Sequence, residues 1–129
     1  EANRFDVESI ALHEIGHLLG LGHSALGETE LRSGGRRVLA AEAVMFPVAF
    51  AAGTTEGRTL RADDIAGISD TYPAPAFRRE RGSVSGRITK NGSGVFGAHV
   101  VAVNLESGAV VGGFALNEQG DYVIAYALP

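Results

Sequence analysis

Residues 13–23 read His-Glu-Ile-Gly-His-Leu-Leu-Gly-Leu-Gly-His, which sets three histidines at fixed offsets. In a helix, His13 and His17 stand one turn apart, so both imidazoles project from one face. Gly20 can adopt a left-handed backbone conformation at low steric cost, which would end the helix and turn His23 back toward the other two rings. Three imidazoles and one water make an open tetrahedral zinc site of the catalytic kind. The spacing therefore predicts zinc ligands at His13, His17 and His23.

Glu14 follows the first predicted ligand, where its carboxylate can face a water held by the metal. It would accept the water's proton during attack on a carbonyl and pass it to the leaving amine, while the metal would hold the developing oxyanion. The alternative interpretation is a buried amphipathic helix whose histidines are satisfied in a core. The chain has four histidines and three of them fall within this motif, which favours the metal site.

Three landmarks resemble, in the same order, the metzincin zinc peptidases and in particular their matrixin (matrix metalloproteinase) subfamily. Residues 13–23 and the serine that follows match the zinc-binding motif of that subfamily. Residues 43–47, Ala-Val-Met-Phe-Pro, are similar to the Met-turn, which implies that Met45 forms an apolar floor beneath the imidazoles rather than a ligand. Residues 60–73 resemble the C-terminal helix of the catalytic domain, so the resemblance covers residues 5–73.

The resemblance implies a secreted, extracellular zinc endopeptidase that acts on proteins or peptides, including those of the extracellular matrix. It implies one catalytic zinc and places Pro47 in the wall of a specificity pocket, although Pro47-Val48-Ala49 departs from the Pro-x-Tyr of many animal matrixins. The family's calcium ligands lie mostly upstream of the position of Glu1, so any calcium site belongs to a full-length parent. A twisted sheet also precedes the zinc helix in that family. We therefore expect a fragment whose first helix is under-buried because that sheet is missing.

Residues 24–44 separate the third predicted ligand from the Met-turn, a longer interval than matrixins usually have. This insertion is polar and rich in glycine, with Ser33-Gly34-Gly35 followed by Arg36 and Arg37. We expect it to be a surface loop that borders the cleft.

Helical periodicity appears in two segments of the first half. Asp6 is the expected N-cap of a helix that runs to about Gly20, and a second helix is expected from Arg61 to Tyr72, stopped by the prolines that follow. Asp63 and Asp64 either cap this second helix in solvent or tie it to the Met-turn, and the sequence leaves both alternatives open. The first helix should bury an apolar stripe made of Val7, Ile10, Ala11, Ile15, Leu18 and Leu19.

The second half changes to β-type patterning. Residues 73–82 contain two prolines and the charged run Arg-Arg-Glu-Arg, which we interpret as a solvated linker rather than a binding patch. Four β-rich runs follow, separated by turn residues, and predict an antiparallel sandwich. Short motifs around Gly86, Gly97 and Gly120 resemble carboxypeptidase regulatory-like, transthyretin-like modules, and we expect this module to be truncated. The four predicted strands are Val84 to Thr89, His99 to Leu105, Ala109 to Leu116 and Tyr122 to Tyr126, with His99 an ordinary strand residue.

The prediction is an α+β chain with a peptidase part over residues 1–76, a linker over 77–82 and a sandwich over 83–129. The absence of cysteine excludes disulfides and thiolate metal sites. A net charge of −4 gives no electrostatic case for binding nucleic acid, and no apolar run reaches membrane-spanning length. Two alternatives remain open: a non-enzymatic adhesion module, and a chain that holds zinc poorly without its sheet and catalyses nothing.

Overall fold

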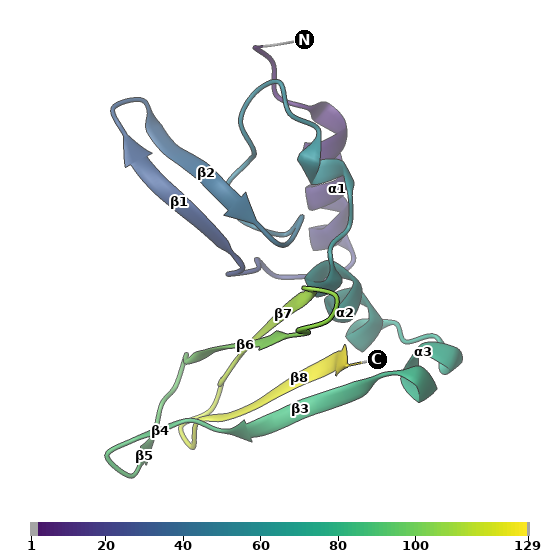
Figure 1. The fold of residues 1–129 in the computed structure, drawn as a ribbon, viewed down its shortest axis with the longest axis vertical. Helices are drawn as coiled ribbons and strands as arrows, with labels where there is room; N and C mark the ends of the chain where they lie inside the picture. The colour runs from purple at the N-terminus through teal and green to yellow at the C-terminus, as the bar shows by residue number, and fades with distance from the viewer. Residues whose placement is uncertain (1–2, 129) are drawn as a thin grey trace. The chain divides into compact units, whose positions relative to one another are not determined.

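The computed structural model describes residues 3–128, which combine α-helices with small antiparallel sheets (Figure 1). This composition confirms the mixed α+β class. Contacts divide the chain into two compact units, with the boundary after Ile68. Within the described residues, no helix is long and apolar enough to cross a membrane.

The first unit begins with helix α1, Val7–Leu18. Its predicted N-cap is confirmed, because the Asp6 carboxylate accepts a 2.9 Å hydrogen bond from the backbone N–H of Ser9. Glu8 in the first turn faces the positive end of the helix dipole. At the other end, Gly20 has a φ of 96°, the left-handed conformation that the sequence predicts. The polypeptide therefore leaves the helix where the motif requires it to turn.

Helix α1 is under-buried, as we expect from the resemblance, whereas the burial of its apolar stripe that periodicity predicts is wrong. All residues of α1 belong to the described part of the chain, and among them only Gly16 is buried. Val7 and Leu18 are 77% and 84% exposed, and the other members of the stripe are exposed as well. The rest of the first unit packs on the side of α1 that carries Gly16 and leaves the apolar stripe exposed. Periodicity identifies an apolar face, but it contains no information on whether a partner covers that face.

The predicted surface loop between the third histidine and the Met-turn is instead a β-hairpin. Strand β1, Gly27–Arg32, pairs antiparallel with β2, Gly35–Ala41. Gly35 has a φ of 117° where the strands reverse, so the glycines expected to make a loop form the turn. Cross-strand pairs such as Glu30 with Arg37 hold the register.

After the Met-turn come a short 3-10 helix, η1, at Glu56–Arg58 and helix α2 at Ala62–Thr71. The second predicted helix is thus confirmed, and it ends before Pro73 as expected. The core of this unit is small and lies between the hairpin base, the Met-turn and α2. Its buried apolar residues are Leu26, Ala41, Ala43, Val44, Met45 and Ala66.

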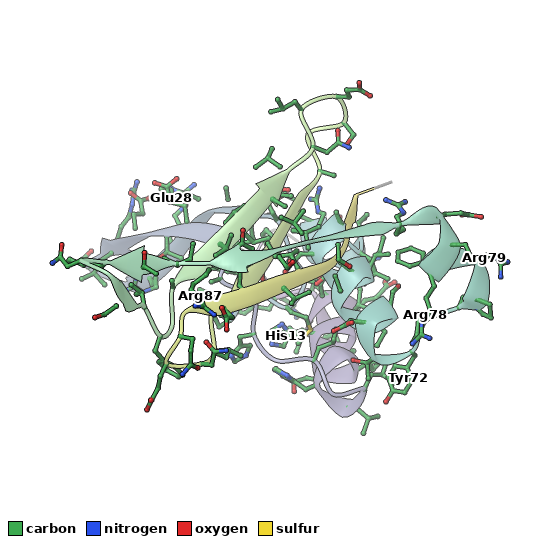
Figure 2. The ribbon with its side chains drawn as sticks, turned by 90° about the horizontal axis from the view of Figure 1, so that it is seen from below. His13, Glu28, Tyr72, Arg78, Arg79 and Arg87 are labelled. Atoms are coloured by element: carbon green, nitrogen blue, oxygen red, sulfur yellow. The ribbon has the colours of Figure 1, made fainter. Side chains whose placement is uncertain are left out.

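In the second unit a short helix, α3, at Pro75–Glu80, lies within the segment that the sequence predicts to be a linker. Pro75 occupies the first helical position, which proline favours because its missing N–H has no helical partner there. Arg78 and Arg79 are exposed and extend from α3 (Figure 2). The charged run is therefore solvated, as predicted, and its residues 78–80 are helical.

The four predicted β-rich runs are strands, and a fifth and sixth short strand form around Asn91 and Gly92. Both turn residues have positive φ, 54° and 83°, as a tight hairpin turn requires. Over the described residues of this unit, the strands form three two-stranded ladders rather than two larger sheets facing each other. The ladders are β3 (Gly82–Arg87) with β8 (Asp121–Leu128), β4 (Thr89–Lys90) with β5 (Ser93–Gly94), and β6 (His99–Val103) with β7 (Val110–Phe114).

The small core of this unit contains Val111, Ala115 and Ile124. His99 is an exposed strand residue, as predicted, and its ring stacks on that of Phe114 with 4.8 Å between the centroids.

Candidate metal centre

The three histidines of the motif come together at the end of α1. Their ring centroids lie 4.7–5.3 Å apart in the three pairs. One ligand atom from each of His13, His17 and His23 lies within 4.8 Å of the other two. The Nε2 atoms of His17 and His23 are 3.2 Å apart. This cluster could hold a metal ion.

The backbone brings these rings together in two steps. Helical spacing places His13 and His17 on one face of α1, and the turn at Gly20 redirects the chain. The N–H of Leu21 then donates to the carbonyl of Gly16 at 3.0 Å and fixes the start of the turn. Beyond the third histidine, the N–H of Ser24 donates to the carbonyl of Met45 at 2.9 Å. The segment that carries His23 is therefore held at both ends.

Two backbone carbonyls determine which ring nitrogens are available. The Nδ1 atom of His13 lies 2.8 Å from the carbonyl oxygen of Val44, and that of His17 lies 2.9 Å from the carbonyl oxygen of Leu21. A carbonyl can only accept, so each Nδ1 is the donor in these contacts, and in the neutral imidazole this leaves the lone pair on Nε2. Neutral imidazoles with a free Nε2 are the form that binds zinc. The donor set thus fits a metal ion on chemical grounds.

Met45 lies under the first helix. It is only 4% exposed, and a Cβ atom added to Gly16 would overlap its sulfur. Gly16 stands next to the second histidine in the sequence, so the thioether packs against the helix backbone at the level of the cluster. The sequence expectation that Met45 forms an apolar floor remains a prediction about its role.

Two adjacent aspartates tie α2 to this region, which settles the alternative that the sequence left open. Asp64 is buried and accepts from the backbone N–H groups of Val44, Met45 and Arg61 at 2.9, 3.1 and 2.9 Å. Asp63 accepts from the Ser24 hydroxyl at 2.6 Å. Neither residue is merely a solvated cap. The two carboxylates fasten the Met-turn and the chain after the third histidine to the same helix.

A pocket opens beside the histidine cluster. Glu14 is exposed and lines this pocket together with His13, whereas Ser9 and Gly57 line a part nearer the start of α1. At 1.5 Å per helical residue, Asp6 and His13 are separated by roughly 10 Å along the axis. The lining residues are Phe5, Asp6, Ser9, Ile10, His13, Glu14, Val44, Phe46, Pro47, Val48, Ala49, Phe50, Ala51, Thr54 and Gly57.

The sequence predicts a metal ligand at His13, a base at Glu14 and a specificity-pocket wall at Pro47, and all three residues line this pocket. Ser9 and Asp6 line it too, although the sequence indicates Asp6 only as a helix cap. The residue also pairs with Arg58, far away in the sequence. The Arg58 guanidinium holds the pKa of the Asp6 carboxyl well below its usual value of 3.8, and hydrogen bonds from Ser9 lower it further. No local pattern around Asp6 indicates this long-range pairing.

Comparison with known proteins gives matches that each cover part of this chain. Residues 1–33 match the family model of the matrixin peptidases. Metalloendoproteinase 5-MMP of Arabidopsis thaliana is 42% identical over 67 residues, which cover 52% of this chain and 14% of that protein. Metalloendoproteinase 1-MMP of the same plant is 38% identical over 89 residues, which cover 68% of this chain and 20% of that protein. Metalloendoproteinase 1 of Glycine max is 44% identical over 68 residues, with coverages of 53% and 17%.

The chain thus spans between 14% and 20% of the length of these relatives. No solved structure gives a significant match. The family model matches the stretch that contains His13, His17 and His23, and these relatives are metalloendoproteinases that this chain matches in part.

Proposed function

We propose that this chain carries the zinc site of a secreted metalloendopeptidase of the matrixin type. In this proposal His13, His17 and His23 hold one catalytic zinc, and Glu14 is the general base and acid. The convergence of the three rings, with two Nδ1 protons already directed to carbonyls, is the observation that carries it. The partial matches to plant metalloendoproteinases support the same assignment.

The chemistry of the donors is compatible with zinc. Imidazole nitrogens suit zinc, and a set of three leaves a position open to water, as in catalytic sites. When bound, zinc supplies Lewis acidity that brings the pKa of a water to roughly 7 and polarises a peptide carbonyl. The chain contributes the fixed orientation of the rings through Val44 and Leu21.

Glu14 is the proton acceptor in this proposal, and its position in the pocket lining supports the role. It follows His13 in α1, is exposed, and lines the same pocket as that histidine. Its carboxylate would take a proton from the attacking water and deliver it to the nitrogen of the departing amine. A general base of this kind accelerates a reaction by a factor of about 10² to 10⁴.

The pocket beside Glu14 supplies a binding site for one side chain of the peptide. Its lining is mostly apolar and includes Val44, Phe46 and Pro47, so it would take an apolar side chain next to the scissile bond. Pro47 would then form part of the specificity wall. For the second half of the chain, we propose an accessory module over residues 83–129, joined to a peptidase part over 1–76 through residues 77–82.

The proposal is tested by metal binding and hydrolysis measured on the same samples. Cobalt replaces zinc as a coloured probe, and each histidine of the cluster changed to alanine should weaken its binding. Glu14→Gln should retain the metal, and its rate of peptide hydrolysis should fall by a factor of about 10² to 10⁴. His99→Asn is the matched control, because His99 lies in the second unit. Tight cobalt binding by the His23→Ala variant, or full activity of the Glu14→Gln variant, would refute the assignment.

The same titration is run on the 129-residue chain and on a longer form of the protein. Metal bound by the longer form alone would show that the 129 residues do not hold the site by themselves. Hydrolysis by the longer form would then still assign the function to the protein.

A further inference from the structure

The end of the pocket toward the start of α1 is lined by an acidic residue, Asp6. Asp6 and Ser9 line it from the first turn of α1, and Gly57 lines it from η1. The approach between these elements is close, because a Cβ atom on Gly57 would lie 2.9 Å from the Cβ of Ser9. The rest of the lining toward this end is apolar, with Phe5, Ile10 and Phe50 among its residues. An apolar pocket with a carboxylate at its end is, in principle, suited to a long basic side chain.

In this chain that carboxylate is already fully engaged. Its Oδ2 accepts from the N–H and the hydroxyl of Ser9 at 2.9 and 2.7 Å, and from Nε of Arg58 at 2.9 Å. Its Oδ1 accepts from Nη2 of Arg58 at 2.5 Å. The remaining guanidinium nitrogen, Nη1, lies 2.8 Å from Glu8. The Asp6–Arg58 pair is therefore bidentate, a geometry that gives a strong charge-assisted interaction.

Arg58 is not among the pocket-lining residues in the described part of the chain. Its side chain is 42% exposed, whereas that of Asp6 is 15% exposed. Arg58 thus pairs with the carboxylate of a residue that lines the pocket, although Arg58 itself is not among the described lining residues. Glu14 is the other acidic lining residue, and it lies at the metal end of the same stretch of helix.

We propose that Arg58 determines the charge preference of this pocket: by pairing with Asp6, it makes the pocket select uncharged apolar side chains and reject basic ones. The inference rests on the proposed function only in that the pocket receives a substrate side chain. A lysine entering the pocket would lose its hydration and find no free carboxylate at the far end, which is unfavourable. Without Arg58, Asp6 would be available as its partner. Arg58 is then a positioning residue that acts through Asp6, not a catalytic one.

The test compares two peptides that differ only in the residue after the scissile bond, leucine in one and lysine in the other. In Arg58→Gln, the ratio of kcat/KM for the lysine peptide to that for the leucine peptide should rise by about tenfold, since one charge-assisted hydrogen bond becomes available. The change should fall on KM for the lysine peptide. Arg58→Lys, which keeps a cation beside Asp6, should retain the native ratio.

A second readout does not require hydrolysis. Binding of N-acetyl-lysine amide and N-acetyl-leucine amide is followed through the backbone amide signals of Ser9 and Gly57, with and without zinc. The native chain should bind the leucine amide, and Arg58→Gln should gain binding of the lysine amide. If the chain does not bind zinc, the proposed function is wrong, but the amide shifts still test the charge preference of the pocket. The two proposals can therefore fail separately.

Two controls complete the design. Asp6→Asn added to Arg58→Gln keeps an oxygen for the helix cap but removes the charge, so the gain for lysine should disappear. Arg87→Gln breaks a comparable ion pair, with Asp121 in the second unit, and should leave the preference unchanged. An unchanged ratio in folded Arg58→Gln, or an equal shift in Arg87→Gln, would overturn the proposal. If Arg58→Gln does not fold, Arg58→Met replaces it, and loss of the fold in both would assign Arg58 a structural role instead.

Discussion

The sulfur of Met45 occupies the space that a side chain at Gly16 would need. This contact joins the middle of the histidine motif to the Met-turn, although the two residues are far apart in the sequence. Glycine costs about 1 kcal/mol relative to alanine inside a helix, so its presence in α1 requires a reason. The close approach of the thioether to the helix backbone supplies one.

Gly16→Ala should therefore weaken metal binding more than it weakens the fold. The helix gains about 1 kcal/mol of propensity, while displacing a buried side chain costs about 1–3 kcal/mol. Because the two terms oppose each other and Met45 is flexible, the free energy of unfolding should fall by only about 1 kcal/mol. The displaced sulfur should nevertheless disturb the neighbouring rings and lower cobalt affinity. Urea unfolding and cobalt titration check this, and an unchanged affinity would contradict it.

Asp64→Ala should be the most destabilising single change in the first unit. It leaves three backbone N–H groups at Val44, Met45 and Arg61 without their acceptor in a buried place. Each unsatisfied group costs about 1–3 kcal/mol, so a loss of roughly 3 kcal/mol or more is expected in urea unfolding. Asp63→Ala is the matched control on the preceding residue. Its hydrogen bond to Ser24 is only part-buried, so the loss there should be smaller, and equal losses would argue against this account.

The features that the sequence predicted correctly depend on short stretches of chain. The Asp6 cap, the turn at Gly20 and the four β-rich runs each follow from the conformational preferences of neighbouring residues. The convergence of the three histidines also follows from spacing, because a helix and one left-handed turn suffice to bring them together. Such features need no knowledge of the partner elements.

The features that it missed depend on contacts between distant segments. The periodicity of α1 indicates an apolar stripe but not whether Val7 and Leu18 are covered, and the hairpin at residues 27–41 required its two polar strands to find each other. The carbonyl of Val44 that orients His13 is 31 residues away from it in sequence. Its oxygen is part of the backbone, so no side-chain pattern identifies it.

Asp6 should make the first unit sensitive to acid. Its folded-state pKa lies well below the usual 3.8, mainly because of Arg58 and then Ser9. A depressed carboxyl pKa adds stability that is fully present above the unfolded value and is lost as pH falls below about 3.8 toward the folded pKa. Asp6→Asn should therefore flatten the decline of the unfolding free energy below that pH. Unfolding by urea at a series of pH values measures the slope, and an unaltered slope would exclude Asp6 as its source.

Gly94→Ala should destabilise the second unit, because a Cβ atom there would overlap backbone atoms of Glu118 and Gln119. Backbone cannot move aside as a flexible side chain can, so the expected loss is about 2 kcal/mol or more. Gly34→Ala is the matched control, since a Cβ atom at Gly34 meets nothing within 4 Å and the residue has no left-handed φ. It should be neutral. Methyl signals of Val111 and Ile124 report the unfolding of this core, and equal effects of the two changes would show that the segment near Gln119 does not pack on β5.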